Sequence, residues 1–414
     1  MTPRKFMIIA GEASGDTLAA ELVRELRSIV SPASDFAPRF FGAGGPRMAA
    51  AGVELAFDMT QHAVVGLIEV AKHYRTLRRR FDELLELACE AEPEVIICVD
   101  FSGFNRRFGH ALKQRVRARR TIFNNWEPLL IQYVSPQVWA SREGRAWKMA
   151  QDFDLLLSIF PFEKAWYAQR LPGFPVEFVG HPMLDRYRDL ELVQPAPESG
   201  GNPMVALLPG SRKGELERHL PVMLGAWRII QAKLPSATAT MVLPTESLLK
   251  MAQSALPGGS LPGLTLQLGD LAGALQRATV AMACTGTVTM ECAYFKVPTV
   301  ALYKTSWSTF QIGKRLITVK YLAMPNLLAD EVVFPEFIQE QATQHNLAVA
   351  ILSLLGDEIR RLEVKAKLAG ILGKLGGPGG TRRAAQVIAA LISDPAGDGE
   401  VSQVDLKACR IPIQ

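Results

Sequence analysis

The sequence lacks the features of metal-binding, secreted and membrane-spanning proteins. Its five cysteines include no Cys-x-x-Cys pair, so we expect reduced thiols, no bound metal and no disulfide framework. No apolar run approaches the roughly 20 residues that cross a bilayer. The first strand also lacks the long apolar segment of a secretion signal. We therefore expect a cytoplasmic protein, either free or peripheral on a membrane that faces the cytosol.

A strong excess of one charge is also missing. The chain carries 46 Lys and Arg against 41 Asp and Glu, a formal net charge of +5, which is too small to indicate nucleic-acid binding. No nucleic-acid motif accompanies the basic residues. Apolar residues make up 48% and charged residues 21% of the chain, as in globular proteins. Its 414 residues are enough for two domains with separate cores.

What the sequence does contain is a regular alternation of short apolar strands with helical patterns, which is typical of parallel sheets covered by helices. A first series of strands is expected at residues 6–10, 39–42, 95–99, 131–134, 155–158 and 176–179. Residues 191–203, rich in Pro, Gly and Ser, interrupt this pattern. A second series follows at residues 204–208, 239–243, 264–268, 280–284 and 299–303.

We therefore predict an α/β protein with two tandem Rossmann-like, doubly wound parallel-sheet domains. The first spans residues 1–190 and is completed by a last helix at about 381–393; the second spans residues 204–375, and residues 191–203 form the linker. Ligands of such sheets bind beyond the carboxyl ends of the strands. Two such edges facing each other would form an interdomain cleft.

The first strand is followed by a turn, residues 11–16, with the sequence GEASGD. Its glycines permit a tight turn, and the N–H groups of the following helix face the end of the strand. Glu12 and Asp16 bracket the hydroxyl of Ser14. Because carboxylates repel phosphate, this turn favours an acceptor sugar or a proton to be removed. For Asp16, a role as helix cap remains equally open.

Two turns in the second series indicate a nucleoside diphosphate. Gly210, Ser211 and Arg212 follow the strand at residues 204–208, and an arginine fork beside helix N–H groups suits phosphate oxygens. Thr285, Gly286 and Thr287 form a similar turn after residues 280–284, and Glu291 lies one helical turn later, placed to accept hydrogen bonds from a ribose diol. A solvated surface turn is the alternative for the arginine, and the second turn is a weak motif by itself.

Six short blocks along the chain are GEASGD (11–16), SPQVWA (135–140), PFEK (161–164), VGHP (179–182), LPGSR (208–212) and MPNLL (324–328). In this order they resemble the signature blocks of bacterial lipid-A-disaccharide synthases, and the resemblance covers roughly residues 5–392. It implies the GT-B architecture of two Rossmann domains, with UDP held by the second. It also implies that Tyr303, Lys304 and Asn326 lie near the nucleotide.

The resemblance further implies the reaction and its partners. The family transfers 2,3-diacylglucosamine from UDP-2,3-diacylglucosamine to 2,3-diacylglucosamine 1-phosphate, forms a β-1,6 linkage with inversion, and releases UDP. The implied location is the cytosolic face of the inner membrane, without a cofactor. Inversion needs one general base and stabilisation of the leaving UDP. Arg212 and the two helix starts can stabilise the UDP without a metal.

Asp100 is the predicted general base, because it ends the apolar run 95–99 at the carboxyl end of a central strand. Glu12 and Ser14 are expected to position the acceptor or relay its proton. The family's matching block carries a second acid where this chain has Gly103, and a tryptophan where it has Ser141. Glu12 as the base, and Asp100 as a helix cap, remain open. His181 is a further candidate, although a lone histidine is more often structural.

A lipid-facing surface is predicted from an apolar stretch followed by cations. Its residues are Val64, Val65, Leu67, Ile68, Lys72, Arg75, Arg78, Arg79 and Arg80. Exposed apolar groups beside cations suit an anionic membrane and the phosphate of a lipid acceptor. The alternative is that the apolar residues are core and the arginines form a solvated helix face.

Two other functions are carried as alternatives. One is a UDP-sugar 2-epimerase of the same architecture. The other, motivated by Gly103 and Ser141, is a catalytically silent, membrane-associated UDP-sugar-binding protein. A homodimer is a further open question.

Overall fold

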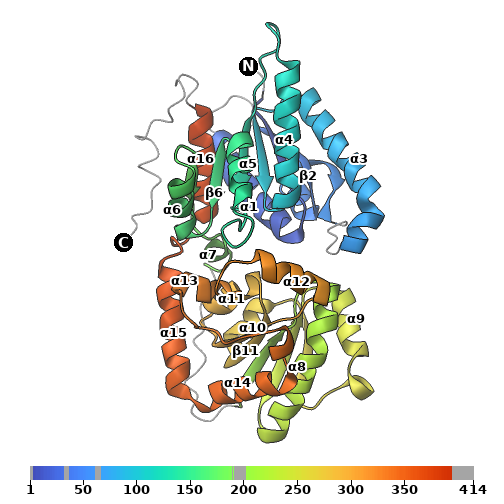
Figure 1. Cartoon of the computed structure of the whole chain (residues 1–414), viewed down its shortest axis with the longest axis vertical. Coiled ribbons are helices and arrows are strands. Elements are labelled where there is room, and N and C mark those ends of the chain that lie inside the picture. Colours follow the sequence, from blue (N-terminus) through green and yellow to red (C-terminus); the bar gives the residue numbers. More distant parts are fainter. Residues whose placement is uncertain (1–2, 32–36, 61–66, 189, 191–201, 394–414) are drawn as a thin grey trace. The chain divides into compact units, whose positions relative to one another are not determined.

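A computed structural model of the chain describes residues 3–31, 37–60, 67–188, 190 and 202–393, with only the backbone for residues 67–74, Pro257 and Ile312. The chain divides into a first unit, Met1–Tyr187 with Leu375–Gln414, and a second unit, Arg188–Lys374. Most of the predicted linker, residues 191–201, lies outside the described residues. Each unit is a parallel sheet with helices on both faces (Figure 1). The predicted α/β fold of two doubly wound sheets is therefore confirmed.

The first unit contains a seven-stranded sheet in the order β3-β2-β1-β4-β5-β6-β7. Its strands are β1 Lys5–Ala10, β2 Arg39–Gly44, β3 Glu54–Asp58, β4 Val95–Val99, β5 Leu129–Tyr133, β6 Leu155–Ser158 and β7 Val176–Phe178. Its helices are α1 Ala13–Val30, α2 Pro46–Ala50, α3 Leu67–Ala91, α4 Ser102–Arg119, α5 Gly144–Asp152, α6 Pro161–Arg170, α7 Met183–Arg186 and α16 Gly380–Ser393.

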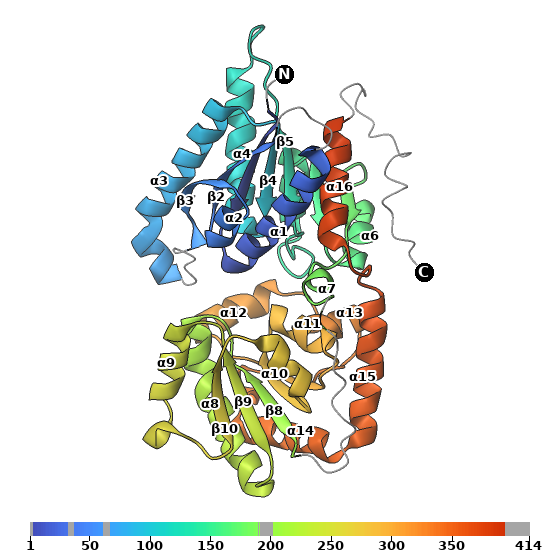
Figure 2. The same ribbon diagram turned by 180° about the vertical axis from the view of Figure 1, so that it is seen from behind.

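Helices cover both faces of this sheet, so its central strands are apolar throughout. All five residues of β4 are buried, as parallel strands between two helical layers require. Helices α3, α4 and α5 lie on one face, and α1 and α16 on the other (Figures 1 and 2). Although α16 is distant in sequence, it packs against α1. The carboxylate of Asp185 accepts hydrogen bonds from the backbone N–H groups of Gly379, Gly380 and Thr381 and so caps α16.

The second unit contains a six-stranded sheet in the order β10-β9-β8-β11-β12-β13. Its strands are β8 Met204–Leu208, β9 Thr238–Leu243, β10 Leu264–Leu268, β11 Val280–Cys284, β12 Thr299–Tyr303 and β13 Glu336–Ile338. Its helices are α8 Lys213–Lys233, α9 Glu246–Ser254, α10 Leu271–Arg277, α11 Thr287–Tyr294, α12 Trp307–Leu316, α13 Met324–Ala329, α14 Gln344–Gly356 and α15 Glu358–Gly373, with the 3₁₀ turns η3 Pro257–Gly259 and η4 Gln339–Gln341.

Two strands escaped the sequence analysis, and both lie at a sheet edge. β3 contains no buried residue, and the three residues of β13 are all partly exposed. An edge strand packs against one neighbour only, so it does not need the continuous apolar run that marks a buried parallel strand. The central strands carried that signal and were predicted.

Candidate active site

The strand order reverses once in each sheet. In the first unit β1 lies beside β4, and in the second unit β8 lies beside β11. At such a point the connections before and after leave in opposite directions, which opens a ligand site at the carboxyl ends of the two strands. The turn at residues 11–16 and Asp100 follow β1 and β4, and the turns at residues 209–212 and 285–287 follow β8 and β11. Each predicted site therefore lies at the reversal of its own sheet.

In the first unit, the two turns are packed together. A Cβ atom built on Gly11 would lie 2.2 Å from Cδ1 of the Phe101 ring, so only glycine permits this approach. A Cβ atom on Gly15 would lie 3.7 Å from the Cβ atom of Asp100. Around this contact Glu12 and Asp100 are partly buried, whereas Ser14 is exposed. The structure thus brings the three predicted catalytic residues to one edge of the first sheet.

Asp16 has a structural role in this turn. Its side chain is only 2% exposed. It accepts hydrogen bonds from the backbone N–H groups of Gly45 at 2.8 Å, Arg47 at 3.0 Å and Met48 at 3.0 Å. Asp16 therefore caps α2 and ties α1 to the end of β2, rather than capping its own helix.

The block at residues 135–140 is held by a buried carboxylate that sequence reasoning missed. Glu163 is fully buried, and it accepts hydrogen bonds from Trp139 Nε1 at 3.0 Å and from the Phe160 N–H at 3.2 Å. Burial raises the pKa of Glu163 to about 7. The position of this acid in the PFEK block was its only sequence signal.

His181 is a neutral, structural histidine. It is 6% exposed, and burial lowers its pKa to about 4. Its Nδ1 accepts a hydrogen bond from the Met183 N–H at 3.2 Å, at the start of α7. Its ring also contacts that of Phe160, with the centroids 5.4 Å apart. These contacts fix the chain after β7. The surroundings of His181 therefore favour a structural role over a catalytic one.

In the second unit, a carboxylate of the protein itself, Glu215, binds the turn after β8. Gly210 has φ +123°, a left-handed conformation that favours glycine. The Glu215 carboxylate accepts hydrogen bonds from the backbone N–H groups of Ser211 at 3.1 Å and Arg212 at 3.3 Å, and from Arg212 Nη1 at 3.3 Å. The sequence analysis expected the N–H groups of this helix start to face phosphate. Instead the N–H groups of Ser211 and Arg212 donate to Glu215, the third residue of α8.

The turn after β11 is open by comparison. Gly286 is the N-cap of α11 and has no side chain to cap it. Gly286 and Thr287 are exposed, and Thr285 and Glu291 are partly buried. The N-terminus of α11 therefore offers backbone donors and a positive dipole end that no side chain of the described residues occupies.

The two turns are close to each other. Burial raises the pKa of Cys284 to about 12, with smaller electrostatic contributions from Glu215 and Arg212. The β8 turn lies near the end of β11 because the two strands pair directly, with Leu208 opposite Ala283. The thiol of Cys284 is consequently protonated and unreactive at neutral pH.

His219 joins two parts of this site, and sequence reasoning missed it. It is fully buried, and burial lowers its pKa. Nε2 accepts a hydrogen bond from the Lys304 N–H at 3.0 Å, so Nδ1 carries the proton and donates to the Pro209 carbonyl at 2.7 Å. A neutral imidazole thus fastens the end of β12 to the β8 turn. As a lone histidine within a helix of mixed polarity, it had no distinctive sequence signal.

The three residues assigned from the resemblance have different environments. Tyr303 is partly exposed at the end of β12. Lys304 Nζ donates to the Gln339 carbonyl at 2.8 Å. Asn326 is fully buried: its Oδ1 accepts from the N–H groups of Val333 and Phe334, while its Nδ2 donates to the Phe334 carbonyl and to Glu336. Its amide is satisfied within the protein, so Asn326 shapes the loop before β13 and has no side-chain atom left for a ligand.

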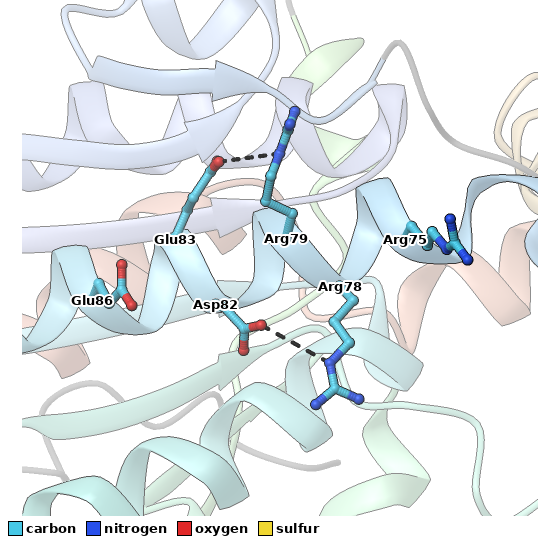
Figure 3. Close-up of a pocket in the computed structure, with 6 residues that line it drawn as sticks. All are labelled: Arg75, Arg78, Arg79, Asp82, Glu83 and Glu86. Atoms are coloured by element: carbon cyan, nitrogen blue, oxygen red, sulfur yellow. Dashed lines mark ion pairs between the residues drawn. The ribbon is translucent and has the colours of Figure 1, made fainter.

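The described part of the predicted lipid-facing surface is a helix face of balanced charge. Val64 and Val65 lie outside the described residues, and the side chains of Leu67, Ile68 and Lys72 are not described. Figure 3 shows an open pocket along α3, lined by Arg75, Arg78, Arg79, Asp82, Glu83 and Glu86. Arg78 pairs with Asp82 at 4.0 Å, and Arg79 pairs with Glu83 at 3.4 Å. Arg80 lies over the Phe57 ring at 4.5 Å and also pairs with Glu83 at 2.8 Å.

Neither a membrane span nor a metal cluster is found in the described part of the chain. None of its helices combines the length and the apolarity that crossing a bilayer requires. The same residues contain no group of three or more His, Cys, Asp or Glu side chains placed to hold a metal ion.

Comparison with known proteins gives one consistent family. The family model for lipid-A-disaccharide synthetase matches residues 6–385. The lipid-A-disaccharide synthase of Trichlorobacter lovleyi is 37% identical over 94% of this chain and 98% of its own length. That of Nitrosococcus oceani is 36% identical over 93% of this chain and 95% of its own length.

Solved structures share the fold at low sequence identity. A putative UDP-N-acetylglucosamine 2-epimerase from Listeria monocytogenes superposes with a TM-score of 0.63 at 14% identity, covering 96% of this chain and 98% of that chain. The calicheamicin glycosyltransferase CalG4 gives a TM-score of 0.59 at 15% identity, covering 96% of this chain and 100% of that chain. At these identities the likeness establishes the fold and not the activity.

The buried position of Asp16 predicts a loss of stability on substitution. Asp16→Ala removes the acceptor of three backbone N–H bonds and leaves buried donors unsatisfied. It should lower the free energy of unfolding of the first unit by about 3 kcal/mol. Urea unfolding, with amide exchange at Gly45 and Met48 as the local probe, measures this. Ser14→Ala, an exposed neighbour, is the control and should unfold like the parent protein. Unchanged unfolding of Asp16→Ala would return this carboxylate to the catalytic candidates.

Proposed function

The chain belongs to the lipid-A-disaccharide synthase family, and from this premise we propose how its two units share the reaction. It is a glycosyltransferase. Its donor is UDP-2,3-diacylglucosamine and its acceptor is 2,3-diacylglucosamine 1-phosphate. The second unit binds the UDP moiety, and the first supplies the general base. The observation that carries this division is the chemistry at the two strand-order reversals: carboxylates at β1 and β4, and an arginine beside an uncapped helix start at β8 and β11.

The diphosphate is assigned to Arg212 and the N-terminus of α11. Glu215 accepts from the Ser211 and Arg212 N–H groups and pairs with the Arg212 guanidinium at 3.3 Å. The diphosphate would compete with Glu215 for that guanidinium and would also accept from the donors of the α11 turn. Glu291, one turn into α11, is placed to accept from the ribose hydroxyls. His219 keeps the β8 turn in register with the end of β12. These groups stabilise the negative charge that grows on UDP as it leaves.

The chemical step is a single displacement with inversion. The acceptor 6-hydroxyl attacks C1 of the donor sugar, the bond from C1 to the phosphate oxygen breaks, and UDP departs with the bonding electrons. The hydroxyl proton passes to the carboxylate of Asp100. Glu12 and Ser14, packed on the same edge of the sheet, orient the acceptor. Because the acceptor hydroxyl attacks from the face opposite the leaving group, one displacement accounts for inversion without a covalent enzyme intermediate.

Mass spectrometry of the products tests the function itself. With both lipid substrates, we expect a β-1,6-linked disaccharide 1-phosphate and an equal amount of UDP. With the donor alone, we expect no change, whereas an epimerase would alter the donor without an acceptor. UDP binding without disaccharide formation would identify a catalytically silent protein.

The base assignment predicts a separation of turnover from nucleotide binding. Asp100→Asn removes the proton acceptor only, so turnover should fall at least about a hundredfold while UDP affinity stays within about twofold. Arg212→Ala should instead weaken UDP binding about tenfold or more. Calorimetric UDP titration and steady-state assays on both lipids measure the two effects.

Gly103, where the family carries a second acid, provides a sharper control. A Cβ atom on Gly103 meets nothing within 4 Å, so Gly103→Asp can be accommodated. We expect no recovery of turnover in the double variant Asp100→Asn, Gly103→Asp, since position 103 is on the first turn of α4 rather than at the strand end. Recovery would move the base to position 103, and undiminished turnover in Asp100→Asn alone would reject Asp100.

Membrane docking through the N-terminal half of α3 completes the proposal. Arg78 and Arg79 are 68% and 67% exposed, and exposed ion pairs with Asp82 and Glu83 are weak enough for the guanidinium groups to exchange to lipid phosphates. The protein then collects both lipid substrates at the cytosolic surface of the inner membrane as a peripheral enzyme.

Vesicle binding tests this docking. The double variant Arg78→Ala, Arg79→Ala should bind phosphatidylglycerol-containing vesicles about tenfold or more weakly, since each cation near an anionic surface contributes about 1 kcal/mol. The matched control is Lys365→Ala, Lys367→Ala on α15, which also removes two cations, one of them ion-paired to Glu331. Equal loss in both variants, or none in either, would argue against a docking role for α3.

A further inference from the structure

Three residues without a glycine's freedom adopt left-handed backbone conformations at the ends of β4 and β5. Asp100 has φ +51°, Phe101 has φ +39° and Val134 has φ +71°. Such values are uncommon for any side chain and strained for a β-branched one. Strain of this kind persists only where the surrounding structure over-determines the backbone, and it concentrates at functional sites. The question is which groups hold these turns.

One buried side chain connects both turns. Gln132, the fourth residue of β5, is 1% exposed. Its Nε2 donates to the carbonyl of Asp100 at 3.0 Å and to the carbonyl of Val134 at 3.2 Å, with the Tyr133 carbonyl at 3.3 Å. The amide therefore bridges two strained turns on adjacent strands through one nitrogen.

Two further hydrogen bonds converge on the Asp100 peptide. Asn105 Nδ2 donates to the same Asp100 carbonyl at 2.7 Å, and the Asp100 N–H donates to the Tyr133 carbonyl at 2.9 Å. The Asp100 backbone is thus held at its N–H and twice at its carbonyl. A backbone fixed at both ends of the residue fixes the direction in which its side chain leaves the chain.

An amide at position 132 is not what packing alone would select. The two residues before it on β5, Leu130 and Ile131, are buried and apolar, and the adjacent strand β4 is buried throughout. A buried amide incurs a desolvation cost that an apolar side chain of the same shape avoids. Its hydrogen bonds go to backbone carbonyls of the turns rather than to a neighbouring side chain. This indicates that the amide stabilises the conformation of those turns.

We propose that Gln132 is a positioning residue that holds Asp100 in its left-handed conformation and thereby aims its carboxylate at the acceptor hydroxyl. The inference rests on the proposed role of Asp100 as general base. Gln132 does not touch substrate; it acts through the Asp100 peptide. A shift of about 1 Å in a catalytic group is enough to cost about a hundredfold in rate, so release of this peptide should be visible in turnover.

The test is Gln132→Leu. This substitution removes the amide donor and replaces it with an apolar side chain of similar volume. We expect kcat to fall at least about tenfold, while UDP affinity and the KM for the donor stay within about twofold. Should Gln132→Leu fail to fold, Gln132→Met retains the unbranched shape and serves the same purpose. A fall in UDP affinity that parallels kcat would show a general structural defect and overturn the proposal.

The chain supplies a matched control in its second unit. Gln267 on β10 donates from Nε2 to the carbonyls of Gly269 at 3.1 Å and Asp270 at 2.9 Å, and Asp270 also has a left-handed φ of +47°. Gln267→Leu therefore removes the same kind of contact from a turn that lies away from the strand-order reversal. It should leave kcat within about twofold of the parent protein. An equal loss of kcat in both variants would show that the effect is not specific to Gln132 and would overturn the proposal.

A double-mutant cycle separates this inference from the base assignment. If Gln132 acts only through Asp100, adding Gln132→Leu to Asp100→Asn should leave the residual rate within about twofold. A further tenfold loss would show that Gln132 acts independently and overturn the proposal. Parent-like kcat in Gln132→Leu, with Asp100→Asn inactive, would overturn the positioning role alone. Parent-like kcat in Asp100→Asn would overturn the base assignment and this inference with it.

Discussion

The constraint on which the structure depends is the reversal of strand order in two parallel sheets. Parallel strands joined by right-handed crossovers place every strand-to-helix turn at the same edge. Where the order reverses, the crossovers diverge and leave that edge uncovered. Both units reverse once, between β1 and β4 and between β8 and β11. The turns that we assign to the chemistry follow these four strands.

The two open edges differ in charge and in backbone. The first unit presents the carboxylates of Glu12 and Asp100 on turns pressed together by Gly11 and Phe101. The second presents Arg212 and an uncapped helix start, with Glu215 holding the neighbouring turn closed. A base requires a localised negative charge, and a departing nucleoside diphosphate requires positive charge and N–H donors. These two requirements are the basis of the roles that we propose for the two units.

Much of the polar chemistry in this protein supports the site without entering it. Asp16 caps α2, His219 ties two turns, Asn326 fills a loop and Gln132 bridges two strained peptides. Each is nearly or fully buried and is hydrogen-bonded mainly to backbone groups. Buried polar side chains of this kind specify the conformation of irregular segments, whose backbone groups have no ladder or helix to pair with. The active turns are built on them.

The sequence by itself determined the fold class, the strands of both sheet interiors and the family. Continuous apolar runs such as residues 95–99 identify strands covered on both faces, and Gly-containing turns after them mark the ligand edge. Edge strands β3 and β13 were not predicted because they lack such a run, whereas the edge strands β7 and β10 were predicted.

Only the tertiary structure decided which polar residues face the site and which support it. Asp16 and Glu12 are both acids of one turn, yet Asp16 is buried against Gly45 and Met48, residues about thirty positions away. His219 and Glu163 gained their roles from partners on other elements, Lys304 and Trp139. A hydrogen bond depends on distances between segments, and local composition contains no record of those distances. The sequence therefore shows which residues are titratable. The burial, the partner and the pKa of each are determined only when the chain is folded.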